Sequence, residues 1–414
     1  MTLPERALSP ALPNWKADFP ALAGTMNGKP LVYLDSGASA QKPRAVIDAM
    51  DACLTGPYAN IHRGLYEFSQ TTTAAYEAAR AKIARFLGAR DNEIVFTRNA
   101  TEGVNLVAAA WGRANLKPGD EILLTQMEHH ANLVPWHMLR DQLGIVVKYI
   151  PVTDAGELDL DKLPALVGPR TKLAAFVHVS NTLGTINPVR DLTARIRAIN
   201  PETRILIDGA QSAAHMKIDV RDLGCDWFVM TGHKLYGPTG IGVLWGRADV
   251  LDAMPPYQGG GDMIERVTLD GSTYLPAPQR FEAGTPAIAE AIGLGAAVDY
   301  IAAIGWPAIA AHEKALADTL FKRLSARKDI RVIGRASHRA CIVSFVHKTA
   351  SAADIGMILD QCGVAVRVGH HCCQPLMDRF GVPGTVRASL ALYNTPDDIS
   401  ALEAGLDKAA KLLS

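Results

Sequence analysis

The chain has 414 residues, of which 48% are hydrophobic, enough for a large core and for more than one domain. Lys plus Arg and Asp plus Glu each number 42, so the zero formal net charge gives no electrostatic footprint for nucleic acid or an anionic membrane. The longest apolar stretch, 287–311, is interrupted by Glu290, Asp299 and Pro307, which excludes an unbroken membrane span there. A small neutral or zwitterionic substrate is the more natural ligand.

The N-terminus and the cysteines indicate a protein of the reducing cytoplasm. Residues 1–20 lack the basic and apolar regions of a signal peptide. The six cysteines are too scattered, in so long a chain, to form a secreted disulfide framework. We expect four of them to be small buried hydrophobic residues, namely Cys53, Cys225, Cys341 and Cys362.

The first two thirds of the chain have the pattern of an α/β domain with a mostly parallel sheet. Helices are predicted over 43–54 and 72–87, the second from its apolar spacing. From about residue 93 to 245, short apolar runs alternate with longer helical patterns, which is typical of repeated βα units. The predicted strands are 93–97, 121–126, 146–150, 173–179, 204–207, 227–230 and 242–245.

After residue 286 the pattern changes to that of a smaller α+β domain. A long alanine-rich helical stretch is followed by predicted strands at 330–333 and 340–346 and predicted helices near 353–361 and 397–413. We therefore expect a large domain, residues 21–294, and a small domain, residues 295–414, on which residues 1–20 pack. Because no low-complexity linker separates them, the junction near residue 295 is predicted to be a helix.

Two predicted strands end in residues with reactive side chains. Asp208 follows the apolar run 205–207, and Lys234 follows the run 227–230 after a Thr-Gly-His turn. Polar residues just past the carboxyl ends of parallel strands are where α/β proteins place their chemistry. A lysine that forms an imine with an aldehyde, and a carboxylate that holds a pyridinium nitrogen, are the groups that pyridoxal phosphate requires. Surface and ion-pair roles are the alternatives for these residues.

The segment 97–103 follows a strand and opens a helix expected over 104–111, so its backbone N–H groups and Thr101 could hold a phosphate. Alternatively, Thr101 is only the N-cap of that helix. Residues 232–239 nearly match a nucleotide-binding P-loop, but Pro238 stands where that motif needs its lysine. Thr231 and His233, beside Lys234, could add further phosphate contacts.

Three more polar side chains follow strand ends at the same expected rim. His129 could lie flat over a pyridine ring and relay a proton, because histidine titrates near neutrality. Gln211 could bond the phenolate oxygen of such a ring or, equally, the backbone. Asn181 follows the strand 173–179.

The segment 367–375 places two histidines and two cysteines in a row after Arg367. Zinc sites space their ligands, so four consecutive side chains do not easily form one tetrahedron, and no metal is expected. A thiolate presented next to imidazoles and an arginine suits a nucleophile better, because positive charge lowers a thiol pKa. A vicinal disulfide between Cys372 and Cys373 is a third reading. Arg387 could clamp a substrate carboxylate through its planar fork or form a structural ion pair.

These motifs together closely resemble the pyridoxal-phosphate cysteine desulfurases of the SufS-like second group, in the aminotransferase class V superfamily of fold type I. The resemblance runs over nearly the whole chain and rests on the segments 33–36, 59–64, 99–103, 128–132, 178–181, 208–211, 232–240, 281–286 and 367–372. It implies an enzyme that converts L-cysteine to L-alanine. The sulfur would be left as a persulfide on Cys372 and passed to a sulfur-transfer protein for iron–sulfur cluster assembly. The alternative is a selenocysteine lyase or cysteine sulfinate desulfinase.

The resemblance also assigns roles to individual residues. Lys234 would join the cofactor and act as base, with Cys372 as nucleophile and His129 stacked on the ring. The expected cofactor contacts are Ala100, Thr101, His129, Asp208, Gln211, Thr231, His233, Lys234 and Thr285. The expected substrate contacts are Arg387, Asn181, His62 and Arg63, the last two with open roles. Thr285 would reach the phosphate of the other subunit, which implies a homodimer with shared sites.

Overall fold

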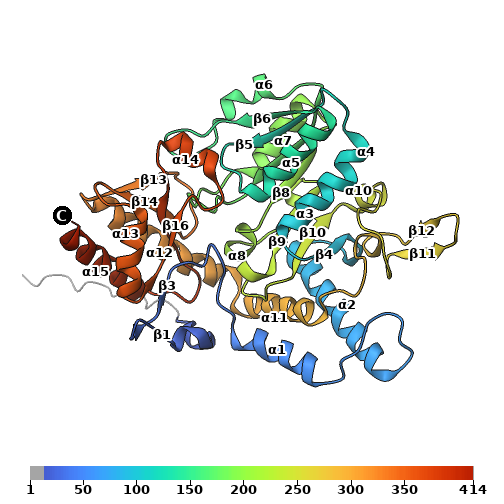
Figure 1. Cartoon of the computed structure of the whole chain (residues 1–414), viewed down its shortest axis with the longest axis horizontal. Coiled ribbons are helices and arrows are strands. Elements are labelled where there is room, and N and C mark those ends of the chain that lie inside the picture. The colour runs from blue at the N-terminus through green and yellow to red at the C-terminus, as the bar shows by residue number, and fades with distance from the viewer. Residues whose placement is uncertain (1–13, 414) are drawn as a thin grey trace, which may run out of the picture.

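The computed structural model describes residues 14–413, so the prediction for residues 1–13 lies outside the described part of the chain. Its centre is a seven-stranded sheet in the order β4-β10-β9-β8-β7-β5-β6, in which only β10 runs against its neighbours (Figure 1). The strands are β4 (Ile94–Thr97), β5 (Glu121–Thr125), β6 (Val146–Ile150), β7 (Thr171–Val177), β8 (Arg204–Asp208), β9 (Trp227–Thr231) and β10 (Gly242–Gly246). The predicted mostly parallel seven-stranded sheet is confirmed, with strand ends shifted by up to two residues.

Both faces of this sheet are buried, which explains the unbroken apolar runs of its strands. Side chains such as Ile205 and Ile207 enter one core cluster, and their neighbour Leu206 enters the cluster on the opposite face. The helices around the sheet include α1 (Arg44–Thr55), α2 (Glu67–Leu87), α3 (Ala100–Leu106), α5 (Val134–Leu143), α7 (Val189–Ile199), α8 (Ser212–His215), α9 (Val220–Leu223) and α10 (Ala248–Asp252). Shorter segments are α4 (Arg113–Asn115), α6 (Leu163–Leu166) and a π-helical turn, Val107–Gly112, between α3 and α4.

Two predicted helix starts were wrong. α2 begins at Glu67, five residues before the predicted start. The prediction missed this first turn because Phe68 and Gln70 are exposed there, so the turn has no apolar pattern. α3 begins at Ala100, whereas the predicted helix began at residue 104. Its N-cap is Asn99, whose side chain accepts a hydrogen bond from the Glu102 N–H, so the reading of Thr101 as the N-cap was also wrong.

The C-terminal part contains the antiparallel sheet β13-β14-β17-β16, with strands β13 (Ile330–Ile333), β14 (Ile342–His347), β16 (Arg367–Gly369) and β17 (Thr385–Ser389). Its helices are α12 (Trp306–Ala326), α13 (Ala352–Gln361), α14 (Gln374–Phe380) and α15 (Pro396–Leu412). The predicted domain division near residue 295 falls inside α11 (Ile288–Ile304), a continuous helix as expected for the junction. Within the described residues, no single helix could span a membrane; only α11 and α12 together, bent by 83°, meet the length and composition required.

A segment near the N-terminus runs along the C-terminal part. β3 (Val32–Tyr33) pairs in parallel with β15 (Val364–Ala365), and Asp35 bridges to Ser389. Phe19 packs edge-on against Tyr236, Tyr300 and Tyr393, which come from both parts of the chain. In the same N-terminal segment, β1 (Thr25–Met26) and β2 (Lys29–Pro30) form a short antiparallel pair.

The hairpin of β11 (Ile264–Val267) and β12 (Ser272–Tyr274) projects from the opposite side of the molecule (Figure 1). Its tip residue Leu269 is fully exposed, and Val267 is 59% exposed. The cysteine predictions held for Cys225 and Cys341, which are buried. They were wrong for Cys53 and Cys362, which are only partly covered at the edges of their core clusters.

Candidate active site

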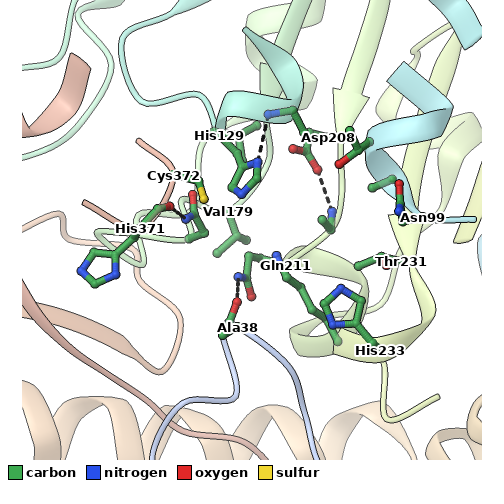
Figure 2. A pocket seen from close by; sticks show the side chains of 18 of the residues that line it. Ala38, Asn99, His129, Val179, Asp208, Gln211, Thr231, His233, His371 and Cys372 are labelled. Carbon is green, nitrogen blue, oxygen red and sulfur yellow. Dashed lines mark hydrogen bonds between the residues drawn. The ribbon is translucent and has the colours of Figure 1, made fainter. Parts of the chain in front are cut away.

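One cavity of about 190 Å³ lies at the carboxyl edge of the large sheet and is bordered by residues of the C-terminal part. It brings together all predicted site residues except His62, Arg63 and Thr285. Those in its lining are Ala100, Thr101, His129, Asn181, Asp208, Gln211, Thr231, His233, Lys234, Cys372 and Arg387. Figure 2 shows His129, Asp208, Gln211 and Thr231 around one space, with Cys372 at its side.

Asp208 is the last residue of β8 and is buried. Its Oδ1 accepts a hydrogen bond from the Ala210 N–H at 2.9 Å. Burial removes water from this carboxyl and raises its pKa. The hydrogen bond from Ala210 and the charge of Lys234 act in the opposite direction but are the smaller effects. A protonated ring nitrogen would supply the missing positive partner, so Asp208 fits the role expected of it.

Lys234 lies in the short helical turn Gly232–Lys234 that follows β9. The turn is fixed because the Gly232 N–H donates to Ile241 O and the Gly232 carbonyl accepts from both Leu235 and Gly237. Burial lowers the pKa of the Lys234 amine to about 8. A minor fraction of this amine, far larger than for an ordinary lysine, is therefore unprotonated near neutral pH, as attack on an aldehyde requires.

His129 is neutral. Burial, together with the charge of Lys234, lowers the pKa of the imidazole to about 3. Its Nδ1 accepts a hydrogen bond from the Ala131 N–H at 3.0 Å, so the ring proton is on Nε2. A neutral ring suits stacking on a pyridine without adding charge. The expected proton relay is disfavoured, because an imidazole with so low a pKa binds an extra proton weakly.

The predicted phosphate contacts lie at the end of the cavity formed by α3 and β9. Because Asn99 caps the Glu102 N–H, the Ala100 and Thr101 N–H groups are left for a ligand. Thr231 Oγ1 is buried without a hydrogen-bond partner, as expected of a hydroxyl that would donate to a phosphate. A Cβ at Gly242 would lie 2.5 Å from the Asn99 backbone, so this glycine lets the turn before α3 approach the sheet.

Gln211 uses one of its two amide hydrogens within the protein, because its Nε2 donates to the Gly37 carbonyl at 2.7 Å. The backbone alternative for Gln211 is therefore observed, and one amide hydrogen remains for a phenolate oxygen. Gly37 and Ala38 also line the cavity and were not among the predicted site residues. They come from the loop after β3, which lies far from the rest of the site in the chain.

Arg387 is nearly fully buried in β17 and has two fixed contacts. It donates to the Asn181 carbonyl and to Asp35 Oδ1, both at 2.9 Å, and its Nε has no partner. Burial lowers the pKa of its guanidinium despite Asp35. The ion pair with Asp35 was missed, because no local pattern links residues 352 positions apart.

The loop that carries Cys372 follows β16, and its thiol is partly exposed to the cavity. We expected imidazoles and Arg367 beside this thiol; the adjacent imidazole, that of His371, is uncharged at neutral pH and adds no positive charge. Burial lowers the pKa of His371 to about 3, and burial together with His370 lowers that of His130. Positive charge in the cavity lining therefore comes from Arg367, Arg387 and Lys234. Among residues 14–413, no group of three or more His, Cys, Asp or Glu side chains could hold a metal ion.

Three predicted contacts lie outside this cavity. His62 Nε2 is 3.0 Å from Glu77 Oε1, and Arg63 forms an ion pair with Asp262 at 3.0 Å. Both residues are exposed, as is Thr285. Within this chain, His62 and Arg63 are therefore outside the cavity lining, and their contacts with substrate stay a prediction.

Comparison with known proteins gives one consistent family. The aminotransferase class V model matches residues 32–402. The cysteine desulfurase of Dickeya dadantii (strain 3937) is 48% identical over 400 residues, covering 96% of each chain. The solved cysteine desulfurase CsdA from Escherichia coli, in its S-sulfonic acid form, is 39% identical, with a TM-score of 0.89 over 97% of this chain and 98% of that one. The apo cysteine desulfurase from Thermococcus onnurineus NA1 is 37% identical, with a TM-score of 0.89 over 96% and 98% of the two chains.

Proposed function

The chain belongs to the cysteine desulfurases of the aminotransferase class V family, and on that premise we propose that it transfers the sulfur of L-cysteine to Cys372 and releases L-alanine. The observation that carries this proposal is the single cavity lined by the Lys234 amine, the Arg387 guanidinium and the Cys372 thiol. These groups can act as base, carboxylate clamp and sulfur nucleophile on one small amino acid.

The cofactor is pyridoxal 5'-phosphate, which withdraws electrons from the substrate α-carbon when it is bound. Asp208 would hold its ring nitrogen, His129 would cover one face of the ring, and Thr101, Thr231 and His233 would hold its phosphate. Gln211 would use its remaining amide hydrogen on the ring oxygen. These assignments agree with the raised pKa of the buried Asp208 carboxyl, which a cationic ring nitrogen would lower, and with the unpartnered hydroxyl of Thr231.

The protein groups then divide the work on the substrate. Arg387 orients the carboxylate of cysteine, and the Lys234 amine removes the proton from its α-carbon. The Cys372 thiolate attacks the substrate sulfur; the new S–S bond forms as the bond between that sulfur and Cβ breaks. A proton added to the same carbon completes the methyl group of alanine. Arg367, His371, Cys372 and Arg387 of the C-terminal part line a portion of this small cavity, so they displace part of the bulk water from around the substrate during these steps.

The decisive experiment follows alanine and the persulfide together. We expect purified protein incubated with L-cysteine and pyridoxal phosphate to form alanine, and the peptide that contains Cys372 to gain the mass of one sulfur atom. Dithiothreitol should remove that mass and release sulfide. Alanine formation without any added mass during turnover would contradict the role of Cys372.

The finer assignments are a SufS-like enzyme, a homodimer with shared sites, and delivery of sulfur to an acceptor protein for iron–sulfur cluster assembly. The dimer is supported by Thr285, His62 and Arg63, which are exposed and lie outside the lining of this chain's cavity. Exposed apolar side chains lie close to them in the chain, including Leu65, which is 92% exposed. We also propose a cytoplasmic location, because a reducing compartment keeps cysteines as free thiols, as Cys372 must be to attack sulfur.

The Arg387→Lys variant tests the substrate clamp. We expect KM for L-cysteine to rise roughly 10- to 100-fold, because lysine loses the planar fork and cannot keep the bonds to Asp35 and Asn181 while binding a carboxylate. The absorbance of the bound cofactor should not change. Steady-state kinetics of alanine formation measure the effect, and an unchanged KM would remove Arg387 from the substrate site.

A further inference from the structure

The loop 370–373, here called the Cys372 loop, has an unusual backbone. It connects β16 to α14, and two successive residues that are not glycine have positive φ angles, 53° at His371 and 55° at Cys372. Each such residue costs free energy, and the conformation persists only where surrounding contacts determine it. The contacts of this loop therefore decide where the Cys372 thiol points.

Three successive carbonyl groups of the Cys372 loop each accept a hydrogen bond. His370 O accepts from the Cys373 N–H at 2.9 Å, and Cys372 O accepts from the His130 N–H at 2.7 Å. His371 O accepts from Asn181 Nδ2 at 2.7 Å. The loop is thus bonded to two of the strand-end segments that line the cavity, and Asn181 has only one amide hydrogen left for substrate.

Cys373 points away from the cavity. It is fully buried, whereas Cys372 lines the cavity, and its Sγ donates to the Glu128 carbonyl at 3.2 Å. Glu128 belongs to the segment 128–130, which also supplies the N–H group that holds Cys372 O and the imidazole of His129. The two neighbouring cysteines therefore have opposite environments: one thiol is open to substrate, and the other bonds the loop to the wall beneath it.

The acid–base state of Cys373 agrees with this arrangement. Burial, reinforced by the nearby Glu128, raises the pKa of its thiol to about 12. At physiological pH the group is a protonated S–H, which can donate a hydrogen bond but is a poor nucleophile.

We propose that Cys373 is a positioning residue whose buried S–H, bonded to the Glu128 carbonyl, holds the Cys372 loop in place, and that the sulfur stays on Cys372 without passing to Cys373. This decides among the three roles open to a second thiol in this motif: a resolving thiol, a vicinal disulfide partner or a small structural residue. The inference rests on the proposed function, since it takes Cys372 as the sulfur carrier.

The variants Cys373→Ala and Cys373→Ser test the positioning role. Alanine removes the donor, so kcat for alanine formation should fall roughly 3- to 10-fold, while KM for cysteine and the cofactor absorbance stay unchanged. Serine keeps a donor at this position and should restore most of kcat. The matched control is Cys362→Ala, which removes a partly buried thiol far from the cavity lining and should have no effect. Full kcat in Cys373→Ala would overturn the positioning role.

The location of the sulfur is tested by tandem mass spectrometry during turnover, because one tryptic peptide contains both cysteines. We expect the added sulfur on Cys372 alone. Sulfur found on Cys373 overturns this inference but leaves desulfurase activity intact, whereas sulfur on neither residue defeats the proposed function itself.

Thiol accessibility gives a measurement that does not depend on how the Cys373 variants fold. In the native Cys372→Ser variant, Cys373 should resist a thiol reagent that labels the partly exposed Cys53 and Cys362. Complete labelling should require unfolding. Labelling of Cys373 as fast as Cys53 would show an accessible thiol and contradict the proposal.

Discussion

Replacing Lys234 with alanine is expected to lower the rate of alanine formation by about 10³-fold, within the usual contribution of a positioned acid–base group. The amine lies in the cavity, and burial lowers its pKa to about 8, so the wild-type side chain can be unprotonated when it must accept a proton. The variant should also lose the absorbance band near the visible edge that a lysine-bound cofactor gives. Both effects are measured on the same preparation, by single-turnover kinetics and absorbance.

The control for this variant is Lys42→Ala. Burial also lowers the pKa of Lys42 to about 8, but its ammonium group bonds backbone carbonyls, including His233 O at 3.2 Å, and does not line the cavity. We expect Lys42→Ala to keep the absorbance band. If both variants lost it equally, the effect would be one of local folding and not of the amine of Lys234.

The second large effect is expected for Cys372→Ser. Alanine formation from L-cysteine should fall on the order of 10²-fold or more, because a serine hydroxyl carries almost no anion at neutral pH and attacks sulfur poorly. The cofactor absorbance and its change on adding cysteine should remain, since Lys234 and Asp208 are untouched. Alanine is measured by chromatography, with Cys53→Ser as the control for removal of a partly exposed thiol.

The same variant separates the desulfurase from a selenocysteine lyase or a cysteine sulfinate desulfinase. A desulfurase should lose its activity on cysteine whatever remains on the other two substrates. Loss of alanine formation from selenocysteine or cysteine sulfinate, with activity on cysteine spared, would contradict the assignment.

Most of the large sheet was predictable because its signal is local. All strands but the edge strand β6 are largely buried on both faces, so they appear as short apolar runs, and the predicted ends agree with β4 to β10 within two residues. The polar residues at the strand ends were predictable for the same reason. Asp208 and Lys234 directly follow such runs, and the parallel arrangement brings them to one edge.

The contacts that were missed join residues distant in the sequence. The pairing of β3 with β15, the ion pair of Asp35 with Arg387 and the bond from Gln211 to Gly37 all depend on how a segment near the N-terminus crosses the molecule. No periodicity or spacing encodes that path. The start of α3 was missed for a smaller reason, since Asn99 caps it through its side chain and the turn fits only because Gly242 lacks a side chain.

The segment 35–37 near the N-terminus contacts both the residue expected to bind the substrate carboxylate and a residue expected to bind the cofactor. Asp35 holds the arginine of the C-terminal part, while Gly37, two residues later, holds Gln211 on the large sheet. A substrate carboxylate that binds Arg387 must share it with Asp35, and any shift of Asp35 is carried through one intervening residue to the wall that contacts the cofactor. Substrate affinity and cofactor affinity are then thermodynamically coupled, so each should change when the other ligand is present.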